Sequence, residues 1–244
     1  MKIVFSRKGF DSSAGGGPSP IVDGRCVSLP IPDTQGIATT TYSNLNLGGH
    51  VKRASKGRIG GWRRCHNDPM FHREQGWAVL GQCGAAQTHL ERQGVGIGDV
   101  FLFFGLFRAD GGASHHRIFG YLVVGEIIPL ADCDEAARKG FADWAHPHAL
   151  GMHASNDALW YGRGRTGAFA SDALQLTVPE GPASLWQVPP WLAQTGLSYH
   201  DKASRWLPGN RLQSVARGQE FVADVGERED ARNWLRGIVA EIER

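Results

Sequence analysis

Hydrophobic and polar positions along the chain alternate between short β-like runs and three helical stretches. Apolar, aromatic and β-branched residues fill Asp99–Phe107 and Arg117–Ile128, and a loop of Gly, Ser and His at 109–116 separates them. This pattern predicts a β-hairpin. Near the end of the chain, apolar residues recur at helical spacing and predict a C-terminal helix; they are Ala231, Trp234, Leu235, Ile238 and Ile242.

Weaker patterns supply the remaining elements. Apolar positions on one face predict a helix over Val79–Arg92, and Asp132 with Glu135 three residues later forms a capping box for a helix to about Trp144. Strands are predicted at Lys2–Ser6, Cys26–Ile31, Ala158–Tyr161, Ala173–Val178, Ser184–Val188 and Glu220–Val225. Residues 34–61 are polar and Gly-rich without a period, and no repeat or linker divides the chain. We therefore predict a single α+β domain over residues 1–244, built on a bent, mostly antiparallel sheet or a partial barrel with flanking helices.

Composition bounds the class of protein without naming a function. The 244 residues are 41% hydrophobic and 20% charged with a net charge of +2, which is typical of a soluble globular protein. The longest apolar run, Val100–Phe107, is too short to span a bilayer, and the N-terminus lacks a signal-peptide core, so we expect a cytoplasmic protein without a membrane partner. Four cysteines without C-x-x-C spacing indicate reduced thiols.

The loop after the first predicted strand is unusually rich in groups that bind ligands. Three consecutive glycines at 15–17 let backbone amides approach a ligand, and basic side chains attract a phosphate. No G-K-[ST] ends the loop, so it is not a Walker A loop, and a plain Asx-turn at Asp11 is the alternative interpretation. Together with Asp33, the binding candidates of this part of the chain are Ser6, Arg7, Lys8, Ser12 and Ser13.

A basic stretch at 50–73 is hidden by the nearly neutral charge of the whole chain. It carries seven Lys or Arg against one acid and includes Trp62, a combination that suits phosphate contact and base stacking. A solvated loop is the alternative, and Arg63 and Arg64 are the candidates for contact with phosphates. In the same stretch, His66 and Asp68 would share a face if extended, although Asp68 before Pro69 is also a common turn starter.

Histidines and amides elsewhere add further candidates. His146-Pro147-His148, with Asp143 before and His153 after, leaves metal, substrate and structural roles open, and we predict no metal site and no particular cofactor. Of Gln82 and Gln87 at most one is expected to line a site, and Gln219 beside Glu220 can read a base edge or move a proton. The predicted catalytic residues are Asp11, His66, Asp68, His148 and Glu220; the further binding candidates are Gln87, His146 and Gln219.

The motifs, taken in chain order, resemble one family. They are SRKGFDSSAGGGPSPI at 6–21, LPIPD at 29–33, HNDP at 66–69, GQCGAAQTHL at 81–90, GDVFLFFG at 98–105, HRIFGYLVVGEI at 116–127, HPH at 146–148, LQLT at 174–177, Trp186–Pro189 and RGQEF at 217–221. The chain is similar over nearly its whole length to the third nucleotide-modification-associated domain family. That resemblance implies a place in predicted DNA base hypermodification systems of bacteria and phages, with DNA or a nucleotide as partner and no settled reaction; it names no protein partner.

A shorter resemblance concerns the predicted hairpin alone. Gly98-Asp99 entering one strand, and a second strand ending Val-Val-Gly-Glu-Ile, are similar to the core of PUA-like barrels such as ASCH, EVE and YTH domains. This resemblance implies a PUA-like partial barrel that holds a flipped or unpaired modified base. The main hypothesis is an enzyme that acts on a modified base in a polar cleft by acid–base chemistry, and the alternatives are a non-catalytic reader of modified bases and a nucleotide-binding protein without DNA contact. One cleft lined by the polar candidates would favour the enzyme.

Overall fold

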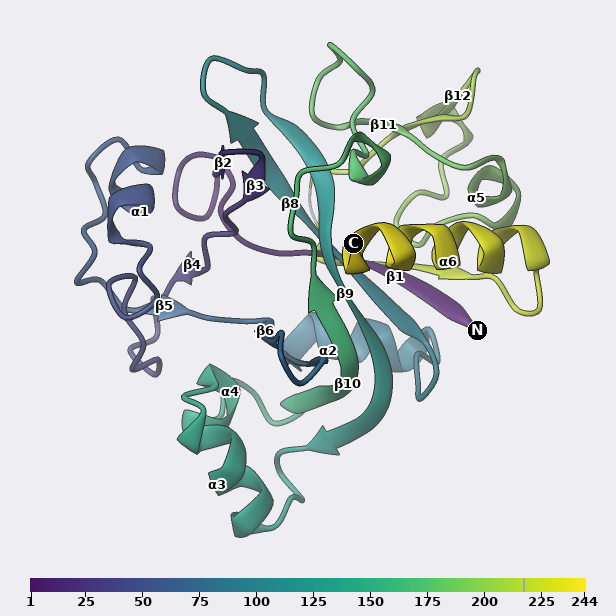
Figure 1. Ribbon diagram of the computed structural model, residues 1–244. Coiled ribbons are helices and arrows are strands. Elements are labelled where there is room, and N and C mark those ends of the chain that lie inside the picture. Colours follow the sequence, from purple (N-terminus) through teal and green to yellow (C-terminus); the bar gives the residue numbers. More distant parts are fainter. Residues whose placement is uncertain (217) are drawn as a thin grey trace.

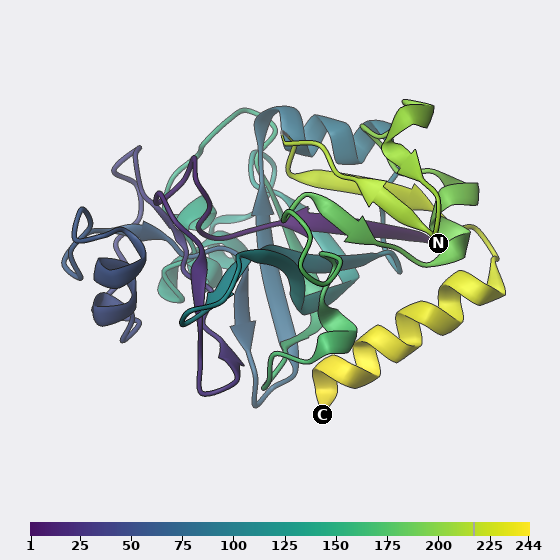
Figure 2. The same cartoon turned by 90° about the horizontal axis from the view of Figure 1, so that it is seen from above.

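A curled sheet runs through the middle of the molecule and has helices on both sides (Figures 1 and 2). The structure is a computed structural model that describes residues 1–216 and 218–244, so Arg217, the first residue of RGQEF, lies outside the described residues. Along the sheet the order is β14 (Glu220–Asp224), β1 (Lys2–Arg7), β8 (Val100–Ala109), β9 (His115–Pro129), β10 (Ala158–Thr166), β7 (Trp77–Gln82) and β6 (Met70–His72), with β2 (Ser19–Val22) and β3 (Arg25–Cys26) added beside β8.

Most neighbouring strands in this sheet are antiparallel. Only the pairs β1–β8 and β2–β8 are parallel among the described strands, and the predicted hairpin is formed by β8 and β9. The prediction of an α+β fold on a bent, mostly antiparallel sheet is confirmed.

Both faces of the central strands are buried, which explains their continuous apolar sequences. On β1, Ile3 and Phe5 pack against α6 (Glu229–Glu243) and its neighbours, whereas Val4 packs on the opposite face near α2 (Gly84–Arg92). β8 alternates in the same way, because side chains of a strand point to opposite faces in turn. Complete burial of one such Phe or Leu side chain contributes about 2 kcal/mol. Figure 2 shows α2 and α6 on opposite sides of the strands.

The predicted helix over Val79–Arg92 is wrong in its first part. The strand β7 continues to Gln82, and α2 begins only at Gly84. Residues 78–82 are all buried, because β7 lies between β10 and β6 with both of its faces covered. A short strand that is buried on both faces has consecutive apolar residues, and periodicity alone does not separate such a run from a helix.

Three smaller predictions also need correction. No strand spans Cys26–Ile31, because its two ends belong to β3 and to β4 (Ile31–Pro32), and Pro30 lies between them. The segment predicted as a strand at Ala173–Val178 begins within a 3₁₀ helix (Asp172–Leu174) and continues only as isolated bridges. The predicted capping box of Asp132 and Glu135 is wrong, because helix α3 (Glu135–Asp143) is capped by Asp134, whose carboxylate accepts from the Ala137 amide at 2.7 Å.

The segment without a period, residues 34–61, folds into part of a small lobe with its own apolar cluster. We call residues 29–66 the α1 lobe, after α1 (Gly48–Ala54). The strand β4 of this lobe pairs with β5 (Cys65–His66), and the apolar cluster contains Phe10, Leu29, Tyr42, Val51 and Cys65. In Figure 1 the lobe stands beside the curled sheet, at the left of the view. It therefore supplies a wall that faces the sheet.

The remaining elements are α4 (Pro147–Leu150), α5 (Pro190–Thr195), a 3₁₀ helix at Ala203–Arg205 and a three-stranded sheet of β11 (Leu185–Gln187), β13 (Arg211–Gln213) and β12 (Trp206–Leu207). Of these, β11, α5 and β13 add side chains to the apolar cluster between the sheet and α6. None of the helices in the described part of the chain is long and apolar enough to cross a membrane.

Candidate functional site

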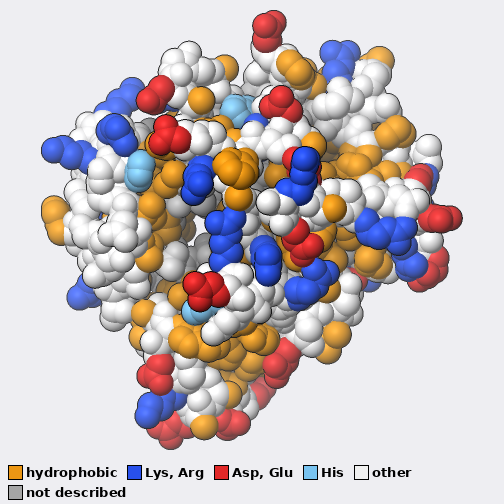
Figure 3. All heavy atoms as spheres, in the orientation of Figure 1, with side chains coloured by type: hydrophobic (Ala, Val, Ile, Leu, Met, Phe, Trp, Pro, Cys, Tyr) orange, Lys and Arg blue, Asp and Glu red, His pale blue; other side chains and the backbone are white. Residues whose placement is uncertain are grey.

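A cavity of about 500 Å³ lies between the α1 lobe and the sheet. The space-filling view shows a hollow there, with Lys and Arg side chains gathered beside it (Figure 3). Its walls come from segments far apart in the sequence: residues 7–14, 31–35, 66–68, 81–83 and 148–153, together with Ala216, Gly218 and Gln219. The sequence-predicted residues that line it are Arg7, Lys8, Asp11, Ser13, Asp33, His66, Asp68, His148 and Gln219. The structure thus brings most of the polar candidates to one cavity.

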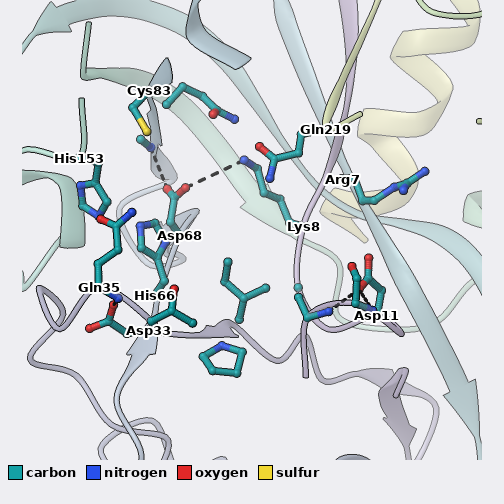
Figure 4. A pocket seen from close by; sticks show the side chains of 18 of the residues that line it. Arg7, Lys8, Asp11, Asp33, Gln35, His66, Asp68, Cys83, His153 and Gln219 are labelled. Carbon is teal, nitrogen blue, oxygen red and sulfur yellow. Dashed lines mark hydrogen bonds and ion pairs between the residues drawn. The ribbon is translucent and has the colours of Figure 1, made fainter. Parts of the chain in front are cut away.

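On one wall, five polar side chains form what we call the lysine cluster: Ser6, Lys8, Asp68, Gln82 and Glu220. The Lys8 ammonium nitrogen lies 3.3 Å from Glu220 Oε1 and 4.0 Å from Asp68 Oδ2. Glu220 Oε1 also accepts hydrogen bonds from the Ser6 hydroxyl, at 2.9 Å, and from the Gln82 amide. Pairing of β1 with β14 places Ser6 directly opposite Glu220, and Figure 4 shows Lys8 pointing toward Asp68.

The two carboxyl groups of the lysine cluster have opposite pKa shifts. Burial alone would raise the pKa of Asp68, but contact with His146 and the charge of Lys8 outweigh burial and hold this pKa below its usual range. Burial raises the pKa of Glu220, against the opposing effects of Lys8 and Ser6. Asp68 lines the cavity, whereas Glu220 is 1% exposed and stands behind Lys8 and Gln82.

On the neighbouring wall, three imidazoles form what we call the histidine cluster: His66, His148 and His153. One ligand-type nitrogen from each ring lies within 4.8 Å of those of the other two. The rings of His148 and His153 are stacked with centroids 4.3 Å apart, and the His66 ring meets both edge-on at 5.1 and 5.2 Å. Burial lowers the pKa of His66 to about 4 and also lowers that of His153. Neutral imidazoles at such separations are a donor set for a metal ion.

A fully buried carboxylate, Asp157, stands behind the histidine cluster. Its Oδ1 contacts His148 Nδ1, while its Oδ2 accepts from the His153 backbone amide at 2.8 Å and lies 3.4 Å from His153 Nδ1. On the other side of the His148 ring is Gly81, where a Cβ atom would lie 2.2 Å from His148 Cδ2. The ring therefore depends on the absence of a side chain at position 81.

Asp11, predicted as a catalytic residue, and Asp33, predicted as a binding residue, use their carboxylate oxygens for hydrogen bonds within their own loops. The Asp11 carboxylate accepts from the Ser13 amide and hydroxyl and from the Ala14 amide, which is the Asx-turn alternative. Asp33 likewise accepts from the amides of Gln35, Gly36 and Ala38. Ser12 is exposed and does not line the cavity.

Arg7 lines the cavity, but its guanidinium is engaged elsewhere. It donates to the carbonyl oxygens of Val215 and Ala216 at 2.9 and 2.7 Å, and in Figure 4 it points away from Asp68. Burial lowers the Arg7 pKa. Arg7 thus anchors the chain that precedes β14, and Lys8 is the cation that faces Asp68.

Other candidates lie outside the cavity. Gln87 is buried and accepts from the Trp160 indole at 3.0 Å, so it joins α2 to β10. His146 is buried behind Asp68, with Nε2 3.3 Å from Asp68 Oδ1. Arg63 and Arg64 are exposed on the α1 lobe, next to Trp62, which is 75% exposed.

Sequence reasoning missed part of the cavity lining. Gln82, rather than Gln87, lines the cavity, because position 82 ends a strand and not a helical turn. Cys83 also lines it, and burial raises the pKa of its thiol. Asp157 carries no local signal, since neither spacing nor motif links it to His148. Asp143, grouped with the histidines by sequence, is exposed at the end of α3.

Comparison with known proteins identifies the family. The model of the family described as nucleotide modification associated domain 3 matches residues 2–224. Among curated proteins and among solved structures no match is found, and the resemblance to PUA-like barrels stays a prediction. Because the family match spans nearly the whole chain and includes every segment that lines the cavity, this chain belongs to the nucleotide modification associated domain 3 family.

Proposed function

We propose that this protein is an enzyme that acts on a nucleobase, in DNA or in a nucleotide, and that the cavity holds this base. The observation that carries the proposal is the pair of opposite charges, Lys8 and Asp68, side by side on the cavity wall. Membership of a nucleotide-modification family supports the choice of substrate class. The cavity volume of about 500 Å³ lies within the usual range for small-molecule sites.

The polar groups of the wall match the edge of a base. A base presents N–H donors beside carbonyl or ring-nitrogen acceptors, and Asp68 accepts from the former while Lys8 donates to the latter. In a reaction, Asp68 would take a proton from the base or from the attacking group, and Lys8 would stabilise negative charge that develops on the base. The amides of Gln82 and Gln219 lie on the same walls and can distinguish one base edge from another.

Glu220 enters this proposal as a positioning residue and not as a catalytic one. It lies behind the wall, and its Oε1 is 3.3 Å from the Lys8 ammonium. Its carboxyl group holds Lys8 in place beside Asp68. In this proposal Glu220 acts only through Lys8, in contrast to the catalytic role predicted from the sequence.

The second candidate function is a non-catalytic reader of modified DNA bases. Exposed Trp62, Arg63 and Arg64 favour contact with nucleic acid, and they lie only a few residues before His66 of the cavity wall. A base in a duplex would have to leave the stack to reach the cavity. Contact between these exposed side chains and the DNA backbone would serve an enzyme and a reader equally. The reaction itself therefore has to be tested.

Mass spectrometry of nucleosides tests the reaction. Unmodified DNA, hypermodified phage DNA and deoxynucleoside monophosphates would each be incubated with the protein and a small-molecule cell extract that supplies group donors. We expect a mass change in one base. The rate at which the altered base forms should fall at least 100-fold in Asp68→Asn and stay unchanged in Asp143→Asn, whose side chain is exposed and does not line the cavity. Thermal unfolding of each variant would confirm that it is folded.

Two outcomes contradict the proposal. Binding of DNA or nucleotide without a mass change in any substrate would establish the reader instead of the enzyme. If the protein binds neither DNA nor nucleotide and changes the mass of no base, both functions are excluded. Full activity of Asp68→Asn would remove Asp68 from the chemistry.

A further inference from the structure

We propose that the histidine cluster is a metal site that binds one Zn²⁺ or a similar first-row divalent ion through His66, His148 and His153. The ion would sit on the cavity wall, with its remaining coordination position open to the cavity. Metal binding is inferred from the geometry of the cluster alone, whereas any part of the metal in catalysis rests on the proposed function.

The positions of the rings carry the first step. Three imidazole nitrogens lie within 4.8 Å of one another and come from three separate places, β5, α4 and the loop after α4. Zn–N bonds of about 2.0–2.1 Å place tetrahedral nitrogen ligands about 3.4 Å apart, so a small rotation of the rings closes the set. Three protein ligands with one open position are typical of catalytic zinc rather than structural zinc.

The carboxylate behind the rings carries the second step. Asp157 Oδ1 contacts His148 Nδ1, and Oδ2 lies 3.4 Å from His153 Nδ1. A carboxylate that accepts from Nδ1–H leaves the lone pair on Nε2, the atom on the opposite side of each ring. Such carboxylate–histidine pairs orient metal ligands and increase their basicity. One buried aspartate therefore orients His148 for metal binding and lies beside His153, whose Nδ1 has no hydrogen-bond partner within residues 1–216 and 218–244.

An unpaired nitrogen carries the third step. His153 Nε2 is buried and has no hydrogen-bond partner among residues 1–216 and 218–244. A buried polar atom of this kind costs free energy unless a ligand or water satisfies it. A metal ion shared with the other two rings would satisfy it.

The donor chemistry selects the class of metal. The set consists of imidazoles without a carboxylate, so Mg²⁺ and Ca²⁺, which take oxygen ligands, do not fit. Imidazole suits Zn²⁺, Cu²⁺, Ni²⁺, Co²⁺ and Fe²⁺. Three neutral ligands leave the full charge of the ion on the site, and such an ion lowers the pKa of a bound water to about 7. Asp68 also lines this cavity. If the metal takes part in catalysis, Asp68 would accept a proton from such a water.

Calorimetric titration of chelator-treated protein with ZnCl₂ tests the site without any substrate. We expect one Zn²⁺ per chain with a submicromolar Kd, and at least a 100-fold loss of affinity in His148→Ala and in His153→Ala. His50→Ala is the matched control, because His50 lies in α1 away from the cavity, and its affinity should be unchanged. Asp157→Asn, which removes no ligand, should lose 10- to 100-fold.

Co²⁺ absorption of the unsubstituted protein provides a second measurement that needs no variant. Visible d–d bands typical of four-coordinate Co²⁺ with nitrogen ligands would support the site. No binding of either ion, or equal affinity in the His148→Ala/His153→Ala double variant, would overturn it. Zinc binding without any reaction on a base would support the metal site and contradict the proposed function. A base reaction in fully chelated protein would support the proposed function and exclude a catalytic role for the metal.

Discussion

The lysine cluster and the histidine cluster share a cavity, and each is associated with a buried carboxylate, but the two carboxylates stand on opposite sides of their partners. In the lysine cluster Asp68 stands at the cavity wall, and its partners Lys8 and His146 surround it. Asp157 stands behind the histidine cluster, and the imidazoles lie between this carboxylate and the cavity. A carboxylate in front can touch a substrate, whereas a carboxylate behind can only orient the groups that do.

One short segment serves both clusters. His146 contacts Asp68 and His148 contacts Asp157, although only Pro147 separates them. Helix α4 begins at Pro147, so the chain turns between the two rings. Neighbouring residues of one motif can therefore belong to different chemical groups. Four variants, three single and one double, test this difference between the two clusters.

The largest effect on stability is expected from Lys8→Met. This change leaves Asp68 and buried Glu220 without their shared cation, and breaking a buried ion pair from one side costs about 3 kcal/mol in the free energy of unfolding. Urea unfolding measures it. Lys2→Met is the matched control, because Lys2 pairs with the exposed Asp224 at 3.7 Å and should cost less than about 1 kcal/mol. Equal costs for the two variants would show that the lysine cluster is not a coupled buried group.

Gly81→Ala should disturb both clusters at once. The new Cβ would lie 2.2 Å from His148 Cδ2, and the Gly81 amide donates to Asp68 Oδ1 at 2.8 Å. Overpacking of this kind costs about 2 kcal/mol, and displacement of the His148 ring should also weaken Zn²⁺ binding at least tenfold. Thermal unfolding and zinc titration measure the two effects. Gly125→Ala on β9 meets neighbours only at 3.6 Å and beyond, and it should change neither quantity.

Glu220→Gln tests the opposite pKa shifts within the lysine cluster. Because burial raises the pKa of Glu220, the folded protein keeps this proton to a higher pH than the unfolded chain does. As pH rises above 4.5, the unfolded chain loses the proton first, so the unsubstituted protein should lose stability relative to Glu220→Gln. Unfolding free energies of both proteins between pH 5 and 8 measure this difference. A difference that stays constant would mean that Lys8 offsets the effect of burial on Glu220, and one that grows in the other direction would mean that Lys8 outweighs it.

The smallest effect on stability is expected from the double variant Arg63→Ala/Arg64→Ala. Both side chains are exposed and outside the two clusters, so the free energy of unfolding should change by less than about 0.5 kcal/mol. If the α1 lobe contacts phosphates, DNA affinity should fall and the slope of log affinity against log salt should decrease by about 2. Salt-independent DNA binding, or an unchanged slope, would limit recognition to the cavity.

Local sequence patterns were sufficient for a large part of the fold. The hairpin of β8 and β9, the strands β1 and β14 and helix α6 all follow from their apolar patterns. The patterns failed where burial on both faces removed periodicity, as at β7, and where short segments depend on neighbours, as in the α1 lobe. Residue types and motifs singled out Lys8, His66, Asp68 and His148, the enzyme hypothesis required them to converge, and the structure places all four on one cavity.

What the sequence determined by itself is therefore the set of elements and the residue types that carry chemistry, because periodicity and motif spacing act over a few residues. Only the tertiary structure decided which of these groups meet. Glu220 is beside Ser6 because β14 pairs with β1, a contact across 214 residues. His66 meets His148 and His153 because the fold brings β5 of the α1 lobe beside α4 and the loop that follows it. Such contacts are set by the burial of the whole apolar core and not by any local pattern. This is why the role of Asp157, and the choice of Gln82 over Gln87, became visible only in the folded chain.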